Sequence, residues 1–191
     1  YDWSEPQGPA LRVRLLQGNV PQELKFDRDT TLKAMRDYAA LSHEASHLGA
    51  LDLVVFPETA WTVPWSMTPP SIVAELFPAT AHRAETGGPT RHLAIGMPLP
   101  ALPGSRAPKA ADGTPDRHPL ANAVLVLAGP DARPIAQYDK SHLVPFGEFV
   151  PWGFRWFVDL MQIPLGDFGR GAVDQAPMPL GANRSPSTSA T

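Results

Sequence analysis

The first third of the chain carries a strand–helix–strand pattern, which constrains the fold more than any other feature of the sequence. Residues 11–16 alternate apolar and charged side chains, the period of a half-buried strand. Residues 26–47 show apolar side chains at helical spacing. Residues 51–56 form a short apolar run between Gly49 and Pro57, typical of a buried strand. This order predicts a βαβ-type start and therefore an α/β fold.

The later part of the chain adds one helix and three strands. The spacing predicts a helix over residues 71–84, strands over 93–97, 121–127 and 134–138, and a hairpin turn at 129–131. Residues 98–119 are rich in proline, glycine and charge, so we expect a surface loop there. Residues 1–10 have the composition of a linker. The 23 prolines and 15 glycines imply long loops, where binding residues often lie.

Composition excludes several classes of function. With 191 residues and 43% hydrophobic content, the chain can bury a core as one globular domain. The net charge of -3 implies no broad basic surface, so nucleic acid is not an expected partner. There is no cysteine, and the six histidines show no metal-ligand spacing, so we expect neither metal nor cofactor. No apolar run reaches the length of a membrane helix, but the chain begins with Tyr1, so we expect it to belong to a longer protein.

A carboxylate follows the second predicted strand directly, in Phe56-Pro57-Glu58-Thr59. The carboxyl end of a central strand is where α/β folds place ligands. Pro57 restricts the backbone beside Glu58, and burial there would suit the carboxylate to general-base work. The alternative is a strand-end glutamate that caps the next turn, and position alone does not separate the two.

A second charged cluster follows the last predicted strand. Lys140 comes at the strand end, and Glu148 follows the stiff turn Pro145-Phe146-Gly147. A lysine near a carboxylate can stabilise an oxyanion or hold a nucleophile. The alternatives are a solvated loop lysine and a turn glutamate bound to a backbone N–H. His142, between them, is more often a packed histidine than a catalytic one.

Aromatic side chains gather just after Glu58 and just after Glu148. These segments contain proline and glycine and read as loops. Aromatic loops beside a site suit an apolar substrate or a membrane interface, whereas the alternative is core packing. The residues are Trp61 and Trp65 in the first group, and Trp152, Phe154, Trp156 and Phe157 in the second.

Together these motifs resemble the carbon–nitrogen hydrolase (nitrilase) superfamily, whose members use a Glu–Lys–Cys triad. Within it they are similar to the bacterial membrane acyltransferases that N-acylate lipoproteins. The resemblance covers about residues 11–180, and its specific part is the Lys140 loop. The matching stretches are Gln17-Gly18-Asn19-Val20-Pro21-Gln22, Phe56-Pro57-Glu58-Thr59, Asn122-Ala123-Val124 and Tyr138-Asp139-Lys140-Ser141-His142-Leu143-Val144-Pro145-Phe146-Gly147-Glu148-Phe149-Val150-Pro151.

The resemblance implies a nitrilase-like α-β-β-α sandwich over residues 11–181, incomplete at its C-terminal side. It also implies an integral protein of the bacterial inner membrane, with this domain facing the periplasm or cell exterior. Such an enzyme takes an acyl chain from a phospholipid as a cysteine thioester. It then passes the chain to the N-terminal amine of a lipoprotein's diacylglyceryl-cysteine.

The resemblance also assigns roles to residues. Glu58 would be the general base, Lys140 would stabilise the oxyanion, and Glu148 would be a supporting acid. The aromatic loops would face lipid. The substrate-binding residues that it implies are Phe26, where the family has a tryptophan, with Trp61, Trp65, Asn122, Trp152 and Trp156.

Two other functions fit the residues less well. A soluble nitrilase-type amidase acting on a small amide would use the same triad. A non-catalytic binding module would keep the fold and lack the nucleophile. The apolar loops and the extension over residues 146–151 favour the acyltransferase over both.

The sequence departs from the family where the cysteine belongs. The family's Ile-Cys-Tyr-Glu strand should follow the turn at Arg170-Gly171, and by length its cysteine falls close to Ala190. The chain instead reads Arg184-Ser185-Pro186-Ser187-Thr188-Ser189-Ala190-Thr191, which is neither apolar nor strand-like. Residues 182–191 therefore look non-native, and without a thiolate we expect the chain alone to be inactive.

A frameshift would explain this tail, and the coding DNA tests it. One allowed choice of codons for residues 184–191 is CGG TCG CCG TCA ACA TCT GCT ACG, and read two bases later this choice gives Val-Ala-Val-Asn-Ile-Cys-Tyr, so the tail is compatible with a frameshift. We expect sequencing of this region to show an alternative frame with a cysteine near codon 190. DNA in which no frame encodes a cysteine there would rule the frameshift out and support the binding module.

Overall fold

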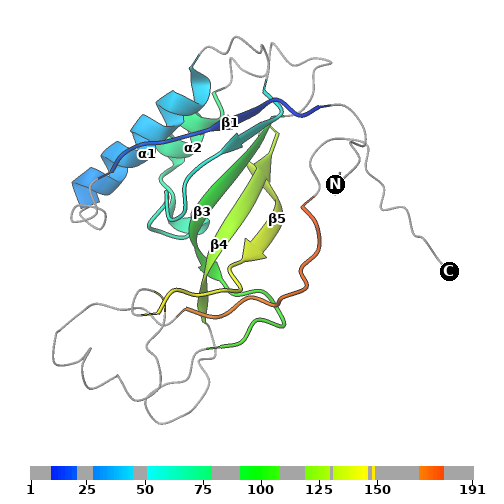
Figure 1. Ribbon diagram of the computed structural model, residues 1–191. Helices are drawn as coiled ribbons and strands as arrows, with labels where there is room; N and C mark the ends of the chain where they lie inside the picture. The colour runs from blue at the N-terminus through cyan, green and yellow to red at the C-terminus, as the bar shows by residue number, and fades with distance from the viewer. Residues whose placement is uncertain are drawn as a thin grey trace.

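The described residues form five strands in one sheet and two α-helices (Figure 1). The computed structural model describes residues 10–20, 28–44, 51–78, 91–107, 119–129, 131–145, 148 and 168–178. The predicted linker, apart from Ala10, and the predicted tail over residues 182–191 lie outside these ranges. The elements are β1 (Val13–Leu15), α1 (Arg28–His43), β2 (Leu53–Val55), a 3₁₀ turn η2 (Trp65–Met67), α2 (Pro70–Leu76), β3 (His92–Pro100), β4 (Leu120–Ala128) and β5 (Arg133–Asp139).

The sheet has the order β1-β2-β3-β4-β5. β1 and β2 are parallel, as the strand–helix–strand pattern predicted, and β2 is parallel to β3. β4 runs antiparallel to both β3 and β5. The carboxyl ends of β1, β2, β3 and β5 therefore meet the amino end of β4 at one edge of the sheet. The α/β class is confirmed, and this open sheet is compatible with part of a nitrilase-like sandwich.

One face of the sheet packs against both helices. Leu93, Ile95 and Met97 alternate along β3 and lie opposite Leu127, Leu125 and Ala123 of β4, in register. These side chains share a core with residues of both helices, which lie together on one side of the sheet in Figure 1. The helix side of this core consists of Met35, Tyr38 and Ala39 from α1 and Ile72 and Leu76 from α2.

The opposite face is less covered within the described part of the chain. Val13 and Leu15 of the edge strand β1 point to that face, and Leu15 is 76% exposed. The described residues supply one sheet and one helical layer. None of the helices among them is long and apolar enough to cross a membrane.

Two predicted boundaries were wrong for reasons that involve proline. α2 ends at Leu76, because Pro78 restricts the preceding residue to extended backbone, which ends a helix. β3 continues through Pro98 to Pro100, into the predicted loop over residues 98–119. Pro98 lies opposite Asn122, whose carbonyl oxygen accepts from Lys140 N just after β5, so the nitrogen of Pro98 faces away from β4. A proline is tolerated there because no ladder hydrogen bond is lost.

Basic side chains cap the carboxyl ends of both helices. Arg14 donates to Leu41 O at 3.1 Å, and Arg91 donates to Ser42 O and Leu76 O at 3.2 and 3.1 Å. His43 Nε2 lies 3.0 Å from Glu75 O and from Leu76 O. These contacts satisfy carbonyls that have no partner within a helix, and they join α1 to α2.

The His43 cap should make stability depend on pH. Burial and the nearby Arg91 charge lower the pKa of His43, against the opposing effect of its bonds to the α2 carbonyls. Below about pH 6.5, His43 binds a proton more readily in the unfolded chain than in the folded chain. The folded state therefore becomes less stable as the pH falls. We therefore expect the urea midpoint, followed by circular dichroism, to fall between pH 7.5 and 5.5, and to fall less in His43→Gln.

His142→Gln is the control, because His142 is an exposed loop histidine. It should lose stability with pH as the unmodified chain does. If His43→Gln and the unmodified chain lose the same amount, the cap does not couple folding to protonation.

Candidate active site

Four polar side chains meet at the carboxyl edge of the sheet. Glu58 follows β2, Asn122 lies near the start of β4, and Lys140 follows β5. Lys140 Nζ lies 2.7 Å from Glu58 Oε1. It also lies 3.1 Å from Oε1 and 3.0 Å from Oε2 of Glu148. Asn122 Nδ2 donates to Glu58 Oε1 at 2.7 Å and also to Glu148 Oε1. The structure thus brings together the three predicted catalytic residues and one predicted substrate-binding residue.

Glu58 reaches this site because the chain leaves the sheet after β2. Phe56 N donates to Ala94 O at 2.8 Å and Trp61 N donates to Gly96 O at 3.0 Å, so the residues between them form an excursion over β3. A Cβ on Gly96 would lie 2.6 Å from Pro57 O and 2.9 Å from Glu58 Cα. Only glycine allows this close approach without a shift of the backbone.

Lys140 is positioned by its backbone on two sides. Its N–H donates to Asn122 O at 2.8 Å, and its carbonyl accepts from Gly171 N at 3.0 Å. The neighbouring Asp139 is fully buried. Asp139 Oδ2 accepts from Leu102 N at 2.7 Å and from Ser105 Oγ at 2.9 Å, which ties the segment after β3 to the end of β5.

Gln175 takes the place of a neighbouring strand beside Asp139. Its Oε1 accepts from Asp139 N at 2.9 Å, and its Nε2 donates to Asp139 O at 2.7 Å. One side chain therefore satisfies both backbone groups of a residue at the open edge of the sheet. Sequence reasoning missed both Asp139 and Gln175. An acid beside the end of an apolar strand was the one available signal, and nothing in the sequence pointed to Gln175.

Glu148 is the most enclosed acid of the site, at 8% exposed. Burial alone would raise its pKa, but hydrogen bonds from Asn122, Val144 N–H and Lys140 together lower the pKa of Glu148 below its usual value. The bond from Val144 N to Oε2 is 2.7 Å long. Glu148 is therefore a carboxylate at neutral pH, held by three donors.

Lys140 stays protonated for a related reason. Burial lowers the pKa of Lys140, but its hydrogen bonds to Glu58 and Glu148 outweigh burial and raise that pKa above its usual value. Its side chain is 28% exposed and that of Glu58 is 59% exposed. The expectation of a buried Glu58 is thus wrong, because the excursion over Gly96 carries this residue above the sheet rather than into it.

Of the predicted aromatic residues, Trp61 and Trp65 lie among the described residues. Trp61 is fully buried, its ring lies edge-on to Phe56 with centroids 5.6 Å apart, and its Nε1 donates to Thr68 Oγ1 at 3.2 Å. Trp65 is half-buried and packs against the same core. Core packing, and not a lipid-facing loop, therefore accounts for Trp61. Phe26, Trp152, Phe154, Trp156 and Phe157 lie outside the described residues.

His142 stands apart from the four-residue site. It is exposed, and its Nδ1 lies 3.1 Å from Ser141 Oγ. Within the described ranges, no three histidine, aspartate or glutamate side chains are grouped so that they could hold a metal ion. The site places the ammonium group of Lys140 between two carboxylates, the exposed Glu58 and the enclosed Glu148. This arrangement suits proton transfer and the stabilisation of an anion.

Comparison with known proteins gives consistent matches along nearly the whole chain. An apolipoprotein N-acyltransferase of Bordetella bronchiseptica is 38% identical over 96% of this chain and 32% of its own length. Those of Ralstonia nicotianae and Nitrosomonas europaea are 37% and 32% identical over 95% and 93% of the chain. The chain spans about a third of the length of these relatives. No family model matches it.

Gly96→Ala tests how the site is held together. The added methyl group would displace the Pro57–Thr59 backbone, so Glu58 would move away from Lys140. We expect the pKa of Lys140 to fall relative to the unmodified chain, because it loses one of its two carboxylate partners. The measurement is a pH titration of the Lys140 side chain by NMR with ¹³C-labelled lysine.

Gly169→Ala is the matched control. Its added Cβ would lie at ordinary contact distance, 3.4 Å from Ala101 and Pro119. Its Lys140 titration should follow that of the unmodified chain. Equal Lys140 titrations in both variants would show that Gly96 does not set the position of Glu58.

Proposed function

Because the chain belongs to the apolipoprotein N-acyltransferase family, as a segment of about a third of its relatives' length, we propose that it forms part of such an enzyme. The whole enzyme would transfer an acyl chain from a phospholipid, through a cysteine thioester, to the N-terminal amine of a lipoprotein. The observation that carries this proposal is the position of Lys140 Nζ between Glu58 and Glu148.

Glu58 has the geometry of a general base. Its Oε1 accepts from Lys140 Nζ and from Asn122 Nδ2, both at 2.7 Å, which fixes the orientation of the carboxylate. Oε2 is then available to take the proton of an approaching thiol. The 59% exposure of the side chain leaves room for that thiol beside it. A positioned base of this kind accounts for roughly 10²–10⁴ in rate.

Lys140 has the geometry of an oxyanion stabiliser. An ammonium group carries three N–H donors, and the contacts to Glu58 and Glu148 account for two of them. The third can donate to the negative oxygen of a tetrahedral intermediate. The raised pKa keeps Lys140 protonated, so the charge is in place before the oxyanion forms.

Glu148 and Asn122 support the other two residues. Glu148 holds the Lys140 ammonium from the enclosed side, and Asn122 spaces the two carboxylates by donating to both. Without the donors Asn122 and Lys140 between them, the carboxylates of Glu58 and Glu148 would repel each other. Asn122 is 8% exposed, which fits a positioning role better than the substrate contact predicted for it.

The chain itself would not complete the reaction, since it contains no cysteine to carry the acyl group. In the whole enzyme the phospholipid and the lipoprotein are the two substrates, and a bacterial membrane is the location. A domain that faces the periplasm would meet both substrates at that membrane. The names of the relatives favour this acyl transfer over a small-molecule amidase or a non-catalytic module.

The proposal can be tested by placing residues 11–178 into one of these relatives, which supplies the rest of the enzyme. Acyl transfer from phospholipid to a diacylglyceryl peptide is then measured in membranes. We expect Glu58→Gln to lower the rate by roughly 10²–10⁴, through loss of the base. Lys140→Met should lower it by roughly 10²–10³, through loss of the oxyanion donor.

Matched control variants separate chemistry from folding. Glu75→Gln and Lys33→Met change the same residue types on exposed helix surfaces, where Glu75 pairs with Arg36 and Lys33 with Asp37. Both should stay within about twofold of the parent, as surface changes usually do. An active chimera that tolerates Glu58→Gln or Lys140→Met would refute the assigned roles.

A further inference from the structure

The outer side of β1 is an open edge of the sheet among the described residues. β1 comes first in the strand order, and β2 is its one neighbour there (Figure 1). An open edge presents N–H and C=O groups that another strand can bind, and proteins usually protect such edges with charges, prolines or covering segments. At the opposite edge of this sheet, Gln175 covers both backbone groups of Asp139.

The hydrogen bonds between β1 and β2 show which residues form the open edge. Arg12 O accepts from Asp52 N at 3.0 Å, and Leu16 N donates to Val55 O at 2.9 Å. The even-numbered residues of this segment therefore direct their backbone groups to β2. Backbone groups alternate in direction along a strand, so those of the odd-numbered residues point to the open edge. These residues are Leu11, Val13 and Leu15.

The side chains at the open edge are apolar and accessible. Leu11, Val13 and Leu15 are 49%, 40% and 76% exposed. Because they alternate with the two arginines, all three lie on the same face of the sheet. A strand that offers both backbone groups and apolar side chains is suited to pairing with a strand of another chain.

The two arginines between these residues do not protect the edge. The Arg12 guanidinium donates to both carboxylate oxygens of Asp52 at 3.1 Å. Arg14 donates to Leu41 O at 3.1 Å and to Glu44 O at 2.8 Å, at the carboxyl end of α1. Both side chains are thus held by groups of their own chain. Charges that are held in this way guard an edge poorly.

The sequence of this edge reads the same in both directions. Residues 11–15 are Leu-Arg-Val-Arg-Leu, with Val13 at the centre. In an antiparallel pair of two such strands about a two-fold axis at Val13, Leu11 lies opposite Leu15 of the second copy and Val13 lies opposite Val13. All three of these pairs would exchange two backbone hydrogen bonds, because their backbone groups face the open edge. Both ends of the strand match their counterparts.

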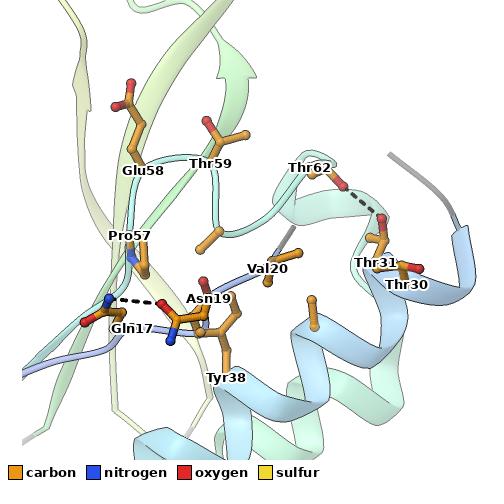
Figure 2. A pocket seen from close by; sticks show the side chains of 13 residues that line it. Gln17, Asn19, Val20, Thr30, Thr31, Tyr38, Pro57, Glu58, Thr59 and Thr62 are labelled. Atoms are coloured by element: carbon orange, nitrogen blue, oxygen red, sulfur yellow. Dashed lines mark hydrogen bonds between the residues drawn. The ribbon is translucent and has the colours of Figure 1, made fainter. Parts of the chain in front are cut away.

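The turn after β1 limits the pairing to this register. Gln17 Nε2 donates to Asn19 Oδ1 at 3.0 Å, and Asn19 has a φ of 48°, in the left-handed region. Figure 2 shows both side chains lining a pocket with Pro57 and with Tyr38 of α1. The chain has therefore left the sheet by Gln17. A shift of the register by two residues would lose one of the three pairs, so the symmetric register is favoured.

We propose that β1 is an interface between two copies of this chain, which pair antiparallel and edge to edge about Val13. A second copy is the occupant because a strand that pairs with itself must match its own reverse, and residues 11–15 do so. Arg12 would face Arg14 of the second copy, but Asp52 already balances the charge of Arg12. The proposal uses no residue of the Lys140 site and does not rest on the proposed function.

Single cysteines test the symmetry axis, because the 191-residue chain has no cysteine of its own. Residues that face each other in a hydrogen-bonded antiparallel pair have Cα atoms about 5.5 Å apart. This separation is within the range that a disulfide spans, roughly 4.4–6.8 Å. We expect Val13→Cys to give a covalent dimer on mild oxidation with copper phenanthroline, measured on a non-reducing gel.

The register is tested with Leu11→Cys and Leu15→Cys. In the proposed pair, two copies of residue 11 are four residues apart along the strand, about 14 Å, which a disulfide cannot span. Neither variant should therefore form a covalent dimer alone. An equimolar mixture of the two variants should form one, because residue 11 then faces residue 15.

Val13→Pro and Val13→Thr form a matched pair for association without oxidation. The N–H of Val13 points away from β2, so proline there removes no hydrogen bond within the sheet but blocks the pairing. Threonine keeps the N–H and the branched shape. Three residue pairs make a small interface, so we expect dimers at roughly tens to hundreds of micromolar in sedimentation velocity. The unmodified chain and Val13→Thr should dimerise, whereas Val13→Pro should stay monomeric.

Three outcomes would overturn the proposal. The first is a chain that stays monomeric throughout this concentration range. The second is a covalent dimer of Leu11→Cys alone, formed as readily as in the mixture, because it would indicate a parallel pair or random collision. The third is a Val13→Pro variant that dimerises like the unmodified chain, which would indicate packing through the face of the sheet. None of these results depends on whether Glu58 and Lys140 catalyse acyl transfer.

Discussion

The ammonium group of Lys140 is the interaction on which the rest of the site depends. It lies within 3.1 Å of carboxylate oxygens from two segments that are distant from each other in sequence. Without a cation between them, Glu58 and Glu148 would face each other as like charges around one asparagine. With the Lys140 ammonium between them, the three groups form a network in which each charge has an opposite partner. Charged side chains can therefore be kept in fixed positions at this edge of the sheet.

Close backbone contacts give this network its geometry. Gly96 lets the loop after β2 lie directly on β3, and Gln175 replaces the hydrogen bonds that a further strand would give to Asp139. Both are contacts between segments far apart in sequence. They explain how side chains after β2 and β5, with β3 and β4 between them, converge on one point.

The sequence was a good guide to the strands and to the three charged residues, and a poor guide to what surrounds them. Strand periodicity and strand-end positions are local properties, so they place Glu58 and Lys140 at strand ends, whereas the catalytic roles of these residues came from the family resemblance and stay predictions. The burial of Trp61 and the bonds made by Asn122 depend on tertiary contacts that leave no local pattern. A tryptophan next to prolines looks like a loop residue until the fold shows that it fills the space between α1 and the sheet.

The way in which Lys140 is held has a consequence for how such a site can diversify. Asn122 and Gly171 bind its main chain, and neither contact uses the lysine side chain. A different side chain at this position would therefore stand in the same place, at the same height above the sheet. The fold therefore fixes the location of this residue through its main chain, whereas the two surrounding carboxylates select a cation as its side chain.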